Sequence, residues 1–138
     1  MKIWHLIGVI FLLTVLACSD KITVSESQVN YKHVTDLSQY NMKIIPEPPT
    51  SADNIRLVVY QDCQYNILAG VTKNGNTIEI EKHFNSMMKL PCMLRNDTIV
   101  IGKLAVGTYQ VNFKLMDLST QVKDHVALAI SFNLQLVK

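Results

Sequence analysis

The sequence predicts an all-β protein, a sandwich of about seven strands, and three observations support this fold class. Short segments rich in β-branched and aromatic residues alternate between apolar and polar side chains, which is typical of half-buried strands. Turn residues separate these segments at intervals of roughly ten residues. Helical periodicity is weak along the whole chain. A succession of short strands and turns favours two packed sheets.

Length and charge narrow the range of functions. The chain has 138 residues and a formal net charge of +2, and 49% of its residues are hydrophobic. This length suits a single domain with one core. Because nucleic-acid binding favours a concentrated basic patch, the near-neutral charge gives no reason to expect a nucleic-acid partner.

Residues 1–17 predict a signal peptide that directs export. Lys2 precedes an apolar stretch from Ile3 to Leu16. A membrane span needs about 20 apolar residues, so this stretch is too short for one, but it suits the hydrophobic region of a secretory signal. The stretch ends in Val15-Leu16-Ala17-Cys18, where a small residue stands directly before a cysteine.

This ending resembles the lipobox of bacterial lipoproteins, and in particular of small Bacteroidetes-type envelope lipoproteins. The resemblance implies that the leader is cut before Cys18 and that this cysteine carries fatty-acyl chains such as palmitate. Two or three such chains hold a protein firmly on a membrane, whereas one binds only marginally. Ser19, rather than an aspartate, follows the cysteine. By the same resemblance this implies the outer membrane, with the protein facing the periplasm or the cell surface.

Two other interpretations of the leader remain open. One is an ordinary secretory signal that is cleaved at the small residues Val15 and Ala17, and the other is an uncleaved anchor.

A polar tether is expected between the leader and the folded domain. Residues 18–40 are polar and lack a sustained period, with at most a short strand at Ile22–Ser25. The expected sandwich domain covers residues 41–138. It begins with a brief apolar run, Met42–Ile45, which three prolines among residues 46–49 bring to an end.

The strands of the domain are predicted from alternation and from turns. An Asn-Gly turn within residues 73–76 predicts a hairpin, and the strand after it places Ile78 and Ile80 inward. Residues 83–96 are expected to form a long irregular connection. In the last strand, even-numbered residues from Leu128 to Leu136 share an apolar face. Strands are expected over residues 55–60, 65–72, 77–81, 97–102, 109–115 and 127–137.

The segment Leu104–Val111 resembles the corner of immunoglobulin-like and fibronectin-like sandwiches, in which a leucine, a glycine turn and a tyrosine recur. The resemblance implies that the Tyr109 hydroxyl bonds back to the backbone and fixes a Greek-key crossover, as a structural tyrosine corner. It therefore implies an immunoglobulin-like Greek-key architecture. The chain differs from antibody domains because the only tryptophan, Trp4, lies in the leader.

Two cysteines, Cys63 and Cys92, remain after the expected lipid anchor is set aside. An exported protein meets an oxidising compartment, so a disulfide between them is expected. The alternative is two separate thiols.

The residues give no sign of catalysis. No sequence motif joins His33, His83 or His125 to a nucleophile or a carboxylate, and glycine-rich phosphate loops and His-Glu-x-x-His are absent from the sequence. We therefore expect no catalytic residues, no cofactor and no enzymatic activity. The expected function is that of a non-catalytic binding or accessory module, held on the membrane by its lipid, with an envelope protein or a glycan as partner.

Metal handling is the alternative function. Imidazole, thioether and thiolate ligands suit copper, and His83, Met87, Met88, Cys92 and Met93 lie close together in the sequence. The competing interpretation is that Cys92 is bonded to Cys63 and that the methionines fill a loop or a gap in the core.

Overall fold

The structure is a computed structural model that describes residues 28–119 and 125–138. The expected signal peptide, the lipidation site Cys18 and the possible strand at Ile22–Ser25 lie outside the described residues.

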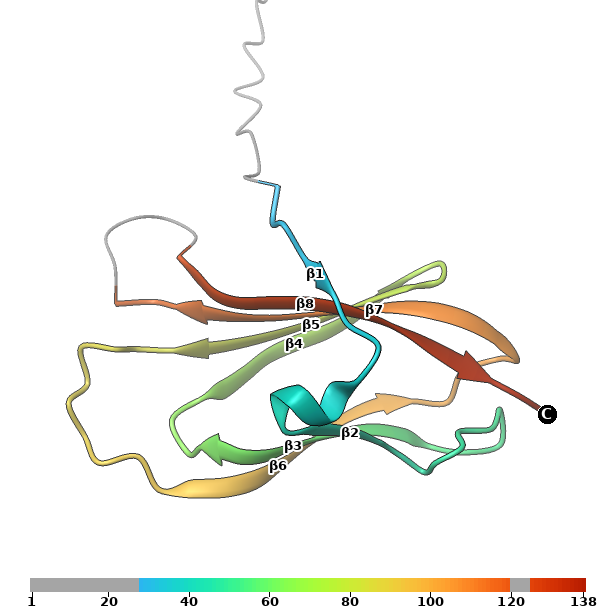
Figure 1. Cartoon of the computed structure of the whole chain (residues 1–138), viewed down its shortest axis with the longest axis horizontal. Coiled ribbons are helices and arrows are strands. Elements are labelled where there is room, and N and C mark those ends of the chain that lie inside the picture. Colours follow the sequence, from blue (N-terminus) through green and yellow to red (C-terminus); the bar gives the residue numbers. More distant parts are fainter. Residues whose placement is uncertain (1–27, 120–124) are drawn as a thin grey trace, which may run out of the picture.

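Two β-sheets pack against each other and form the domain (Figure 1). The larger sheet has five strands in the order β1-β8-β7-β5-β4, and the smaller has three in the order β2-β3-β6. A short 3-10 helix, η1 (Leu37–Tyr40), precedes β2. The strands are β1 (Lys32–His33), β2 (Met42–Ile45), β3 (Ile55–Cys63), β4 (Ile67–Asn74), β5 (Thr77–Phe84), β6 (Leu94–Gly102), β7 (Gly107–Asp117) and β8 (Val126–Leu136).

The core lies between the sheets, and alternation along each strand supplies it. Ile78 and Ile80 are buried on β5, as the pattern predicted, and the even-numbered residues of β8 from Ile130 onward are buried too. On β7, Tyr109, Val111 and Phe113 are buried. The all-β sandwich predicted from the sequence is therefore confirmed.

Two strand pairs of the larger sheet are parallel. β1 lies parallel to β8, and β5 lies parallel to β7 with Ile78 opposite Val111. Immunoglobulin domains are built from antiparallel sheets. The immunoglobulin-like part of the expectation therefore stays a resemblance.

The last part of the expected tether contacts the sandwich. Lys32 and His33 pair with β8 as the two-residue strand β1, and Val34 is buried in the core. The Val34 amide donates to the Ser131 carbonyl over 2.8 Å. Two strand residues are too few to show a period in the sequence, so composition alone placed this segment in the tether.

The connection expected over residues 83–96 is shorter in the structure. β5 continues to Phe84 because its whole length pairs with β7, and β6 begins at Leu94, which pairs with Cys63. Backbone pairing with a neighbouring strand thus extends both strands beyond their alternating pattern. The predicted hairpin between β4 and β5 is present, and Gly75 adopts the left-handed φ of 58° that its turn requires.

Candidate functional site

Lys82 is the one lysine of the described residues whose side chain is buried in the sandwich. It follows Ile78 and Ile80 on the inward face of β5, and only 1% of its surface is exposed. Burial of an ammonium group without partners would be very costly, so lysine is almost never fully buried unless it is paired.

A bulge in β3 places the first partner of Lys82. The register of β3 against β6 shifts between Val59 and Asp62, and Gln61 within the bulge has a φ of 53°. Ile55, Leu57 and Val59 point inward by alternation, and the extra residue makes Asp62 the next inward side chain. The Gln61 amide donates to Asn96 Oδ1 across the strand pair, over 3.4 Å.

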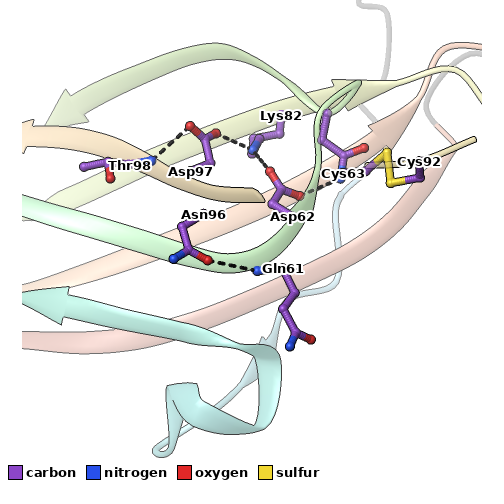
Figure 2. A network of polar contacts seen from close by, with 9 residues as sticks. Gln61, Asp62, Cys63, Lys82, Cys92, Asn96, Asp97 and Thr98 are labelled. Atoms are coloured by element: carbon purple, nitrogen blue, oxygen red, sulfur yellow. Dashed lines mark hydrogen bonds and ion pairs between the residues drawn. A yellow bond between two sulfur atoms is a disulfide. The ribbon is translucent and has the colours of Figure 1, made fainter. Parts of the chain in front are cut away.

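Lys82 bridges the two sheets through two carboxylates (Figure 2). Its Nζ donates to Asp62 on β3 and, over 2.6 Å, to Oδ2 of Asp97 on β6. Asn66 Nδ2 donates to the other oxygen of Asp62, Oδ1, over 2.7 Å. Burial alone would raise the pKa of Asp97, but the hydrogen bond and charge of Lys82 outweigh it and hold that pKa below its ordinary value.

A disulfide lies beside this network. Cys63, which directly follows Asp62, is bonded to Cys92, with 5.5 Å between their Cα atoms. The predicted pair is therefore confirmed. On the chain-entropy model a loop of this length stabilises the fold by about 3.5 kcal/mol. Cys63 belongs to β3, and Cys92 precedes β6 by two residues, so the disulfide joins β3 to the connection that leads into its neighbour β6.

One end of the sandwich exposes several large apolar side chains, and we call it the methionine-rich end. It consists of the turn after β3 with the first residue of β4, and of the connection from β5 to β6 with the first residue of β6, and both lie at the same end of the molecule (Figure 1). Met87 is 73% exposed and Met93 is 65% exposed. Residues 85–96 hold Lys89 and Arg95 and no acidic residue. The apolar side chains of this end are Ile67, Met87, Met88, Leu90, Met93 and Leu94.

The outer face of the larger sheet carries a cavity of about 880 Å³ whose polar groups bond to one another. Glu79 accepts from the Tyr31 hydroxyl over 3.0 Å and from Asn112 Nδ2 over 2.6 Å. Glu81 contacts Lys114 Nζ at 2.7 Å and His83 Nε2 at 2.5 Å. A polar ligand at this face would have to displace these contacts.

These contacts also set two pKa values on this face. Burial, together with the hydrogen bond to Glu79 and the charge of that carboxylate, raises the pKa of Tyr31. Burial would raise the pKa of Glu81, but Lys114 and His83 outweigh it and lower that pKa.

Two of the five residues of the alternative copper site already have partners. Cys92 is held in the disulfide, and His83 contacts Glu81 on the outer face of β5. Met87, Met88 and Met93 are exposed at the methionine-rich end. Within residues 28–119 and 125–138, no group of three histidine, cysteine, aspartate or glutamate side chains is placed to hold a metal ion.

Sequence reasoning did not find the buried network. The signal was present, because the alternation that places Ile78 and Ile80 inward continues to Lys82. Asp62 had no such signal, because a bulge changes which side chains point inward and alternation does not show bulges.

The histidines of the described residues lie apart in the fold. His33 lies in β1, His83 lies in β5, and His125 directly precedes β8.

Comparisons with other proteins give no family. Neither the family models, nor the curated proteins, nor the solved structures contain a significant match to the chain. Among the residues that the structure describes, none belongs to a helix long and apolar enough to cross a membrane.

Proposed function

We propose that this protein is a lipid-anchored envelope lipoprotein that acts as a non-catalytic binding module, with its methionine-rich end as the docking surface for an envelope protein. The proposed anchor is Cys18, supported by the apolar leader and the lipobox-like ending at that cysteine. The single observation that carries the binding role is the cluster of exposed apolar side chains at one end of the sandwich.

Exposed apolar clusters of this kind mark interaction sites in soluble domains. Six large apolar side chains, each about half exposed or more, lie there, four in the connection from β5 to β6 and one at the start of each of β4 and β6. Methionine suits such a surface because its flexible, polarisable side chain adapts to the shape of a partner. Lys89, in a connection that holds no acidic residue, favours a partner with an acidic group beside its apolar centre.

The cavity on the larger sheet is a weaker candidate for the docking surface. Its charged side chains already pair with one another, so binding there would break contacts before it made new ones. Binding at the methionine-rich end would not have to break these ion pairs.

Site-specific photocrosslinking in living cells tests this role. We expect a photoreactive amino acid at Met87 to give a protein adduct of defined mass. The same label at Val106, which is 50% exposed in the connection from β6 to β7 at the other end, should give none. Met93→Glu in the Met87-labelled chain should lower the adduct yield about tenfold, equivalent to about 1.4 kcal/mol of binding free energy.

Two results would overturn the docking surface. One is the same set of adducts from both labelled positions, which would show that the contacts are not specific to this end. The other is an adduct with phospholipid in place of protein at Met87, which would show that this end lies on the bilayer.

A further inference from the structure

We propose that Lys82 and Asp62 form an intramolecular isopeptide bond, with Asp97 as the proton carrier, and that this bond joins the two sheets covalently. The reaction is a self-modification of the folded chain and is independent of the proposed binding function.

The geometry brings the reacting groups together. Lys82 Nζ contacts Oδ2 of Asp62 directly, and both side chains are buried between β5 and β3 (Figure 2). Holding the amine against the carboxyl group that it attacks replaces a bimolecular encounter by an intramolecular step. The fold thus supplies the proximity that amide formation between two side chains lacks in water.

Each neighbour of the pair has a role in the chemistry. Asp97 Oδ2 lies 2.6 Å from Lys82 Nζ, which suits a base that takes a proton from the ammonium. Asn66 Nδ2 donates to Oδ1 of Asp62 over 2.7 Å, and Oδ1 is the oxygen that stays in the product. This amide polarises the carbonyl and stabilises negative charge on Oδ1 during attack.

The step balances without any further reactant. Asp97 takes one proton from the Lys82 ammonium, and the freed Nζ lone pair attacks Cγ of Asp62. The bond from Cγ to Oδ2 breaks, and Oδ2 leaves as water with two protons. One of these protons returns from Asp97, and the other comes from Nζ. The product is a neutral amide and one water, and Asp97 is again a carboxylate.

Burial favours the product. A lysine and an aspartate held away from water keep two charges that are costly to desolvate, even when they are paired. Condensation removes both charges and leaves an amide. The disulfide joins β3 to the connection that leads into β6, whereas this bond would join β3 to β5 and so tie the two sheets together.

Peptide mass spectrometry of the purified wild-type chain tests the proposal directly. Trypsin is applied after the disulfide has been reduced and alkylated. We expect peptide 57–73 to be joined to peptide 74–89, with a mass one water below their sum. We also expect no cleavage after Lys82, because its amine is acylated. Separate peptides 57–73 and 74–82 from the folded protein would overturn the proposal and leave the three residues as an ion-pair network.

Two variants separate the roles of the residues. Lys82→Arg keeps the positive charge beside Asp62 but should give unlinked peptides, because the guanidinium does not condense with the carboxyl. Asp97→Asn should also give unlinked peptides, because the amide does not accept the ammonium proton. A fully linked Asp97→Asn chain would overturn the role of Asp97, and the wild-type measurement stands whether or not either variant folds.

Discussion

At the scale of single residues, Tyr109 shows how one hydroxyl group fixes the connection between two sheets. Its ring is buried in the core at the start of β7, and its hydroxyl donates to the Ala105 carbonyl over 3.2 Å. This is the contact that the resemblance to a tyrosine corner implies. The bond joins β7 to the connection that leads into it from β6 on the opposite sheet.

Removing this hydroxyl should weaken the fold without emptying the core. We expect Tyr109→Phe to lower the free energy of unfolding by about 0.5–1.5 kcal/mol, because the ring stays and one hydrogen bond is lost. Urea denaturation followed by circular dichroism measures the change. Tyr65→Phe is the matched control, since the structure records no hydrogen bond of the Tyr65 hydroxyl to the described residues. Equal losses in both variants would contradict the role of Tyr109.

Lys82 shows where residue-scale prediction reaches its limit. A charged residue after an alternating strand is normally placed at the surface, because isolated charges are rarely buried. Its burial depends on Asp62 and Asp97, which are distant in sequence and reach it through a bulge and through sheet packing. The alternation of β5 places Lys82 inward, but no local pattern indicates which carboxylates lie beside it.

At the scale of elements, alternation in the sequence predicted where the strands lie better than it predicted which strands pair. The β4–β5 hairpin follows from its Asn-Gly turn, and the long strands β7 and β8 follow from their regular apolar faces. The parallel pairing of β5 with β7 could not be predicted, because it joins strands separated by β6 on the other sheet. β1 could not be predicted either, since two residues carry no period.

Asp117 links the end of β7 to the connection that leaves β5. Its Oδ1 accepts from the Ser86 amide over 3.1 Å and from the Ser119 amide over 2.9 Å. The hydrogen bonds from Ser119 and Ser86 hold the pKa of the Asp117 carboxyl well below its ordinary value. A carboxyl whose pKa is lower in the folded state than in the unfolded state stabilises the fold at pH values above the unfolded-state pKa, which is about 3.9. That stabilisation is lost as the pH falls toward the folded pKa.

The pH dependence of stability should therefore report on Asp117. Between about pH 6 and about pH 3, we expect the free energy of unfolding to fall less steeply in Asp117→Asn than in the wild type. At about pH 6 the variant should be the less stable of the two, because the asparagine side chain is a weaker acceptor for the two amides. Denaturation curves at several pH values measure both effects. Parallel pH profiles for the two chains would contradict this account.

At the scale of the whole molecule, the proposed lipoprotein consists of an anchor, a short tether and a compact domain with one apolar end. Cys18 and Tyr31 are 13 residues apart in the sequence, which corresponds to a reach of at most about 45 Å. An acylated Cys18 would therefore keep the domain close to the membrane surface. The methionine-rich end would then meet partners that lie in or on the same membrane.

Only part of the architecture of the domain could be predicted from the sequence. Alternation and turn residues are enough to predict the all-β sandwich, and the expectation that the chain is exported predicted the pairing of Cys63 with Cys92. The methionine-rich end could not be predicted, because exposure depends on where the connections lie in space. The methionines of this segment could equally have filled a core.

Metabolic labelling with a clickable palmitate analogue, followed by membrane fractionation, tests the central claim of a lipid anchor most directly. We expect the wild-type protein to carry the label and to sediment with the outer membrane, because acyl chains on Cys18 hold it there. Cys18→Ala should carry no label and should leave that fraction. A labelled Cys18→Ala chain, or an unlabelled wild-type chain, would contradict the account.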